Sequence, residues 1–260
     1  MDFSLTEEQV LLRDSVEKYV AENCSVERHR ALAATEAGFD PQAWSQFAEL
    51  GWLAVPFAET HGGFDGGAVD VMVICEALGK ALVREPYLHT VITCGGFLQR
   101  GGSNAQQAQY IPWIIDGSAQ WAFAFAERGS DFDLANVATR ATSSGAGYTL
   151  DGRKIAVLNG HCADYLIVSA RLEDAVGLFI VDSGAAGVER EAFVAVDGSR
   201  GAHISFDGVE VDADARLGEP GDGLQLVREV VDHAIVAMAG ETLGHIHQLL
   251  VATLEYTRTS

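Results

Sequence analysis

The chain has 260 residues, and 37 Asp and Glu residues against 17 Lys and Arg residues give it a formal net charge of −20. Such an acidic surface repels the phosphates of nucleic acids and of anionic membranes, so we expect neither as a partner. Apolar residues make up 48% of the chain, which predicts a folded protein with a sizeable core and argues against disorder.

The N-terminus and the cysteines indicate a cytoplasmic protein. The opening MDFSLTEEQ has neither the basic region nor the apolar region of a signal peptide. Charged residues or glycines interrupt every apolar run before it reaches the length of a membrane span. No C-x-x-C pair occurs among the four cysteines, Cys24, Cys75, Cys94 and Cys162. We therefore expect reduced, mostly buried thiols.

Helix start and stop signals come first along the chain. Thr6 followed by Gln9 predicts a capping box, in which each side chain satisfies a free backbone N–H of the first turn. Asp40 and Pro41 together predict a second helix start, with an N-cap residue followed by proline at the first helical position. Gly51 can end that helix in a left-handed conformation.

Three further helices are expected in this region, over residues 69–75, 87–100 and 103–115. The first of them is apolar nearly all round, which is typical of a buried helix. The last is opened by another capping box, formed by Ser103 and Gln106.

The apolar period then changes from 3.6 to 2 after residue 118, which predicts strands. Trp121, Phe123 and Phe125 alternate with alanines, as in a strand with one bulky face, and such aromatics usually face a packed interior. The dipeptides at 151–152 and 207–208 are both Asp-Gly, and each predicts a tight turn between two strands. The expected strands are 147–150, 154–158, 165–170, 178–181, 203–206 and 209–211.

A helical period returns at Asp222 and continues to Ser260. A helix of that length would span about 57 Å, too long to be buried within this chain alone. With no Gly or Pro to stop it, we expect a helix that is cut rather than finished. The sequence predicts an α+β protein: a helical domain over 1–117, an antiparallel β-domain over 118–221, and the start of a C-terminal helical bundle over 222–260.

Several local motifs, in this order, resemble those of the acyl-CoA dehydrogenase family. They are LTEEQ (5–9), GWLAVP and HGG (51–56 and 61–63), EALG (76–79), AERGSD (126–131), GRKIAVLNG (152–160) and EYTRT (255–259). The segments FAER (125–128), DLA (133–135) and CADYLIVSA (162–170) are most similar to the small subunits of pimeloyl-CoA dehydrogenase-type heteromeric enzymes. The resemblance extends along the whole chain.

The resemblance implies a flavin-dependent desaturation of an acyl-CoA thioester whose acyl group is of medium or long chain, with a dicarboxylyl group as one option. It also implies FAD, held mainly by a larger dehydrogenase subunit, with electron-transfer flavoprotein as the acceptor. Two alternatives stay open: a non-catalytic scaffold or acyl-CoA-binding pseudoenzyme, and a self-sufficient homotetrameric dehydrogenase.

The resemblance places the family's flavin contacts at Phe125, Ala126, Ser130, Ala156, Val157 and Leu158. At three of these positions the family side chain is lost: alanine and leucine replace two threonines, and alanine replaces the tryptophan that covers the ring system. A lost hydroxyl hydrogen bond costs about 1 kcal/mol, and the missing ring about 1–3 kcal/mol. We therefore expect a weakened flavin site. Ser130 either contacts a ligand or caps its own turn.

No catalytic base can be named from the sequence. Where some relatives carry a glutamate on the long helix, this chain has Ala234 and then Ile235. Asp232 lies about 200° away round the helix and cannot substitute. A metal site is not expected either, because His245 and His247 are two residues apart and do not share a helix face.

Overall fold

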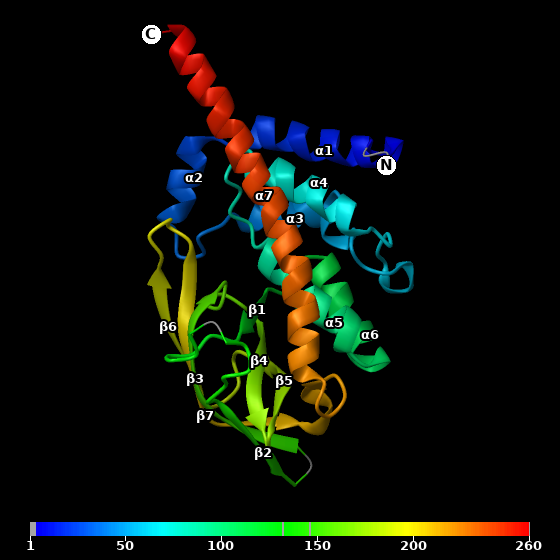
Figure 1. The fold of residues 1–260 in the computed structure, drawn as a ribbon, viewed down its shortest axis with the longest axis vertical. Coiled ribbons are helices and arrows are strands. Elements are labelled where there is room, and N and C mark those ends of the chain that lie inside the picture. Colours follow the sequence, from blue (N-terminus) through cyan, green and yellow to red (C-terminus); the bar gives the residue numbers. More distant parts are fainter. Residues whose placement is uncertain (1–3, 132, 146, 260) are drawn as a thin grey trace.

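The structure, a computed structural model, describes residues 4–131, 133–145 and 147–259 (Figure 1). The helices are α1 (Glu7–Asn23), α2 (Val26–Ala33), α3 (Pro41–Glu49), α4 (Ala68–Gly79), a π-helix (Tyr87–Cys94), α5 (Gly95–Gly101), α6 (Asn104–Ile115) and α7 (Gly223–Thr259), with 3-10 turns at Trp52–Ala54, Glu59–His61 and Ala213–Ala215. The strands are β1 (Trp121–Ala124), β2 (Arg140–Ser144), β3 (Gly147–Leu158), β4 (Tyr165–Leu172), β5 (Ala175–Asp182), β6 (Val188–Val194), β7 (Arg200–Asp212) and β8 (Arg216–Leu217).

The helix starts predicted from capping signals are confirmed. Thr6 Oγ1 accepts from the N–H of Gln9 at 3.2 Å, and the Gln9 side chain accepts from the N–H of Thr6 at 3.0 Å. The capping box that opens α6 forms in the same way. Gly51 adopts φ 78°, the left-handed conformation expected after α3.

The helix predicted over residues 87–100 is two elements. Its first part is the π-helix, within which the side-chain hydroxyl of Thr93 donates to the carbonyl oxygen of Leu88, five residues earlier, at 2.9 Å. The tighter α5 follows from Gly95, where the chain passes close to Phe57: a Cβ at that position would lie 2.5 Å from its ring. Helix α2 was not anticipated from the sequence. Its N-cap is Ser25, whose hydroxyl accepts from the N–H of Arg28.

The strands form one sheet in the order β6-β7-β3-β2-β4-β5-β8, with β1 paired to β4. Most pairs are antiparallel, as expected, but β1 and β2 each run parallel to β4. Strand β1 joins the two halves of the molecule. Its bulky residues, Trp121 and Phe123, belong to the core shared with the helices, whereas Ala122 and Ala124 face the core of the sheet.

The two predicted Asp-Gly turns are wrong. Residues 147–158 form one continuous strand, and so do residues 200–212. The two dipeptides lie opposite each other, where the pairing of β3 with β7 shifts register between Leu150 and Gly152. Asp151 Oδ1 accepts from the N–H of Gly208 at 2.9 Å, so the carboxylate bonds across the irregularity. Asp-Gly supplies the backbone freedom for a bulge as readily as for a turn.

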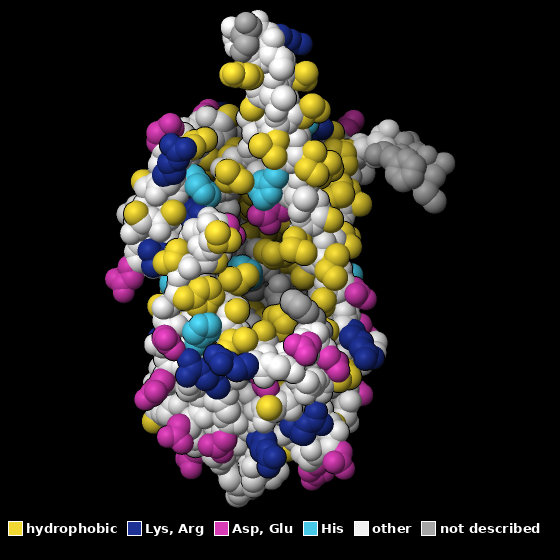
Figure 2. Space-filling model, turned by 60° about the vertical axis from the view of Figure 1, so that its left-hand side comes forward, with side chains coloured by type: hydrophobic (Ala, Val, Ile, Leu, Met, Phe, Trp, Pro, Cys, Tyr) yellow, Lys and Arg dark blue, Asp and Glu magenta, His cyan; other side chains and the backbone are white. Residues whose placement is uncertain are grey.

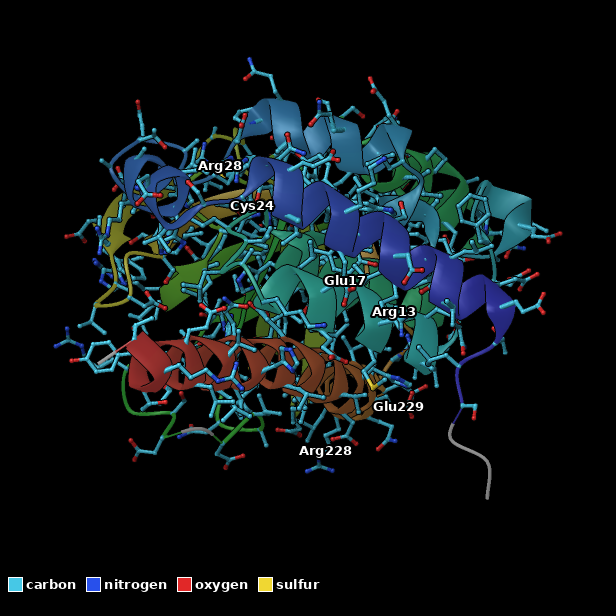
Figure 3. All side chains as sticks on the ribbon, turned by 90° about the horizontal axis from the view of Figure 1, so that it is seen from above. Arg13, Glu17, Cys24, Arg28, Arg228 and Glu229 are labelled. Atoms are coloured by element: carbon cyan, nitrogen blue, oxygen red, sulfur yellow. The ribbon has the colours of Figure 1, made fainter. Side chains whose placement is uncertain are left out.

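Helix α7 runs along the molecule from the sheet past α5 and α4, and its last turns project beyond the other helices (Figure 1). Its buried residues all lie between Gly223 and Gly244. Figure 3 looks down the long axis of the molecule. In that view Arg228 and Glu229 lie on the outer side of α7, and Glu17 lies on the side of α1 nearest α4. In the part of the chain that the structure describes, no helix is long and apolar enough to cross a membrane.

Candidate functional site

Two segments of the β-domain carry most of the expected flavin contacts, and the fold brings them together. The first segment is the loop that follows β1. The second is the last part of strand β3, where the pairing with β7 shifts register between Lys154 and Val157. The N–H of Ile155 donates to the carbonyl oxygen of Ala126 at 2.8 Å. This bond holds the segment after β1 beside the end of β3.

A buried ion pair lies behind these loops. Lys154 is fully buried, and its Nζ lies 2.6 Å from Glu127 Oε1 and 3.0 Å from Ser169 Oγ. The Glu127 carboxylate also accepts from the backbone N–H groups of Ala138 and Thr139. Burial alone would raise the pKa of Glu127, but the hydrogen bonds from Lys154 and Thr139 outweigh it and lower that pKa.

The three expected contacts on β3 differ in direction. Val157 is buried and its side chain belongs to the sheet core, so it can offer a ligand only its backbone. Ala156 is exposed, has φ 51°, and donates its N–H to His203 Nδ1 at 3.2 Å. Leu158 is 39% exposed and lines a cavity of about 610 Å³.

The contacts expected after β1 face elsewhere. Phe125 is 40% exposed and stacks on Phe123, with ring centroids 5.0 Å apart. Ser130 donates its hydroxyl to the carbonyl oxygen of Glu127 at 3.0 Å, within its own turn. Phe125 and Ser130 line a small void of about 10 Å³, separate from the cavity that Leu158 lines.

These side chains do not fit a flavin that this chain would hold alone. The isoalloxazine has a polar edge that needs donors and acceptors, and five of the six expected positions carry apolar side chains. The single hydroxyl, on Ser130, is bonded within its turn. Two backbone groups at the expected positions also have protein partners: the carbonyl oxygen of Ala126 accepts from Ile155, and the N–H of Ala156 donates to His203.

This cavity of about 610 Å³ lies between the helical domain, α7, the end of β3 and the connection from β6 to β7. Figure 2 shows this face hollowed, with histidine and acidic side chains among apolar ones in the hollow. Its size lies within the range typical of small-molecule sites, about 300–1,000 Å³. The lining includes Leu78 of α4, Leu82 and His89 of the next segment, and Leu158 of β3. Burial lowers the pKa of His89 to about 4, so its imidazole is neutral near pH 7.

One side of the cavity carries charged side chains of both signs, with Glu85 and Asp197 beside two arginines. Arg84 and Arg200 both line it, and Arg84 donates to the backbone oxygens of Gly38 and Gly198. His161 lines the same side and contacts the carbonyl oxygen of Ala37 at 2.8 Å. Arg84, after α4, thereby ties the segment before α3 to the connection between β6 and β7, and His161 ties the same segment to the connection between β3 and β4.

Helix α7 contributes a carboxylate and an imidazole to the same cavity. Glu241 Oε1 lies 3.9 Å from His245 Nε2, one helical turn away, and each side chain is about one-third exposed. Burial raises the pKa of Glu241, and the nearby His245 partly opposes the shift. Within the described structure, His245 Nε2 is buried without a hydrogen-bond partner.

Sequence reasoning missed both this pair and the buried Lys154–Glu127 pair. The signal for the first was visible, because a glutamate and a histidine four residues apart share a helix face. Nothing local marks Lys154 as buried: its neighbours Arg153 and Ile155 are exposed or half-buried, and burial depends on the sheet behind it. The described residues contain no group of three or more His, Cys, Asp or Glu side chains that could hold a metal ion.

Comparison with known proteins agrees with this architecture. Residues 6–118 match the model of the acyl-CoA dehydrogenase N-terminal domain, and residues 122–209 match that of the acyl-CoA dehydrogenase middle domain. The chain is 28% identical to acyl-CoA dehydrogenase FadE27 of Mycobacterium tuberculosis, covering 100% of this chain and 67% of that protein. It is 29% identical to a short-chain-specific acyl-CoA dehydrogenase of Megasphaera elsdenii, covering 99% and 70%.

Solved structures show the same fold. A chain of the ChsE4-ChsE5 complex from Mycobacterium tuberculosis matches with a TM-score of 0.90 at 28% identity, covering 100% of this chain and 69% of that one. A chain from a study of the electron transferring flavoprotein of Acidaminococcus fermentans matches with a TM-score of 0.91 at 25% identity, covering 100% and 70%. On the strength of the two domain matches, this chain belongs to the acyl-CoA dehydrogenase family.

Proposed function

We propose that this chain is the small subunit of a heteromeric acyl-CoA dehydrogenase, and that a larger partner subunit holds most of the FAD. Members of the family use FAD. The observation that carries the proposal is the loss of polar side chains where the flavin would be held. Ala126, Ala156 and Leu158 offer no side-chain hydrogen bond, and the hydroxyl of Ser130 is engaged in its own turn.

The far end of α7 supports the proposal of a partner. Leu249, Leu250 and Leu254 are exposed toward the end of α7, the helix whose last turns project beyond the other helices (Figure 1). Contiguous exposed apolar side chains are typical of surfaces that another protein covers. One structure with the same fold is described as a complex of two proteins, ChsE4 and ChsE5.

In this proposal the chain supplies binding surface rather than the cofactor's polar contacts. Its cavity would take the acyl group of an acyl-CoA, and the apolar side chains of Leu78, Leu82 and Met238 would exclude water from it. The family resemblance further suggests electron-transfer flavoprotein as the electron acceptor, and the spacing of the cysteines suggests the cytoplasm as the location. The class of reaction would be the α,β-desaturation of the thioester.

The test compares the chain purified alone with the chain co-expressed with a candidate larger dehydrogenase subunit. The proposal expects visible flavin absorbance and acyl-CoA-dependent dye reduction only in the co-purified complex. Stoichiometric FAD in the lone chain would contradict it and would favour a self-sufficient homotetramer. Full activity of the larger subunit without this chain would instead identify a non-catalytic scaffold.

A further inference from the structure

The wall of the large cavity that α7 provides is a single stripe of side chains. Met238, Glu241, Thr242 and His245 all line the cavity, and their spacing places them on one face of the helix. The stripe changes in character along its length. It is apolar at Met238 and becomes ionisable at Glu241 and His245.

The backbone position of Glu241 is fixed by the packing of α7 against α4. A Cβ at Gly79 would lie 2.1 Å from the carbonyl oxygen of Glu241, so the two helices are in direct backbone contact there. Cys75 and Leu78 of α4 line the cavity beside it. The carboxylate therefore lies on a rigid support and faces mostly apolar neighbours.

Glu241 and His245 lie away from the position at which some relatives carry the catalytic base. Ala234, the position at which some relatives carry a base, precedes Glu241 by seven residues, or about 10 Å along the helix. Leu158, which the resemblance places beside the flavin, lines the same cavity. An acyl chain whose thioester lay near Leu158 would extend through this cavity toward Glu241 and His245.

His245 is incompletely satisfied without a ligand. Its Nε2 is buried and has no hydrogen-bond partner among the described residues, and the nearest carboxylate oxygen, on Glu241, is 3.9 Å away. That separation is too long for a direct hydrogen bond. A buried polar atom without a partner is costly, so such atoms usually mark a missing water or ligand.

We propose that this cavity takes an acyl group with a hydroxyl at its distal end, and that Glu241 and His245 bind that hydroxyl. The inference rests on the proposed function, because it takes an acyl-CoA as the ligand. One hydroxyl both donates and accepts, so it satisfies the carboxylate of Glu241 and the Nε2–H of His245 together. A terminal methyl would leave both groups unpaired, and a terminal carboxylate would be repelled by an ionised Glu241.

The test uses the full chain and measures dissociation constants for hexanoyl-, octanoyl- and decanoyl-CoA, each with and without an ω-hydroxyl. The corresponding ω-carboxyl thioesters form a third series. We expect one chain length at which the hydroxyl tightens binding on the order of tenfold, the effect of one or two hydrogen bonds. Glu241→Leu and His245→Leu should abolish that preference while the plain acyl-CoA still binds, which also shows that each variant folds.

The matched control is His247→Leu, which removes an imidazole from the same helix but outside this cavity. It should keep the hydroxyl preference, as should the conservative Glu241→Gln in large part. Equal binding of plain and hydroxylated acyl groups at every length would overturn the inference alone. Tightest binding of the carboxyl series would overturn the choice of a hydroxyl. Binding of none of the thioesters would contradict the proposed acyl-CoA function itself.

Discussion

Lys154 Nζ lies 2.6 Å from Glu127 Oε1, and neither side chain is open to solvent. The pair links β3 to the loop after β1, the same two segments whose backbones meet between Ile155 and Ala126. It therefore stabilises the relative positions of the two segments that carry the expected flavin contacts. Neither side chain lines the 610 Å³ cavity.

Replacing Lys154 by methionine should destabilise the protein strongly. The substitution leaves the Glu127 carboxylate buried without its cation, and breaking a buried pair in this way costs about 3–5 kcal/mol. The measurement is the free energy of unfolding in denaturant. The control is Arg153→Met, which removes an exposed ion pair with Glu191 and should cost no more than about 1 kcal/mol. Equal losses of unfolding free energy in the two variants would show that the buried pair does not stabilise the protein more than an exposed one.

Helix α7 should tolerate alanine at Gly240 but not at Gly244. A Cβ at Gly244 would lie 2.1 Å from the carbonyl oxygen of Glu76 and 2.8 Å from the N–H nitrogen of Lys80, so backbone must move. At Gly240 the nearest atoms are the side-chain Cγ and the carbonyl oxygen of Met72, both 3.1 Å away, so a shift of a few tenths of an ångström suffices. Overpacking costs about 1–3 kcal/mol, while alanine gains up to about 1 kcal/mol in helix propensity.

We therefore expect Gly244→Ala to lower the thermal midpoint clearly and Gly240→Ala to change it little. Differential scanning calorimetry on both variants measures this. A stabilised Gly244→Ala protein would mean that α4 and α7 are not packed backbone to backbone.

Glu241→Gln should become relatively more stable as the pH rises. Burial raises the pKa of Glu241, the largest influence, while His245 lowers it and Cys75 lies nearby. Between the unfolded and the folded pKa, the folded state binds the proton more tightly, so stability falls as pH rises through that window. Glutamine cannot ionise and avoids this loss, by no more than about 1 kcal/mol because the side chain is one-third exposed.

Unfolding titrations from acid to neutral pH, on wild type and Glu241→Gln, measure the difference. If the free energy of unfolding of Glu241→Gln, relative to that of wild type, fell toward neutral pH, the raised pKa of Glu241 would be refuted.

The exposed end of α7 should matter for assembly and not for folding of this chain. Leu249→Glu combined with Leu250→Glu changes two exposed side chains, and surface substitutions of that kind alter stability by about 0.5 kcal/mol or less each. Co-purification with the larger subunit should fall sharply, because the charges would be buried in the interface. The control is Arg228→Glu with Glu229→Arg on the outer side of α7 (Figure 3). Undiminished co-purification of the leucine variant would place the partner elsewhere.

Local chemistry predicted the helical domain well and the sheet less well. Thr6, Ser103 and Asp40 satisfy backbone groups within three residues of themselves, so their effect is readable along the chain. The two Asp-Gly dipeptides were misread as turns, since Asp151 and Gly208 adopt their conformations by bonding to each other across two strands. A partner 57 residues away leaves no trace in a local pattern.

The same division applies to the candidate site. The order of elements, the family resemblance and the missing hydroxyl and ring side chains could all be recognised in the linear sequence, because they depend only on residue type and spacing. Ser130 uses its hydroxyl within its own turn, one of the two alternatives that the sequence left open. The burial of Lys154 depended on the loop after β1 and on β4, which supply Glu127 and Ser169. Whether Glu241 and His245 shared a cavity with Leu158 depended on how α7 packs on the rest of the fold. Burial and pairing arise from contacts between distant segments, and these exist only once the chain has folded.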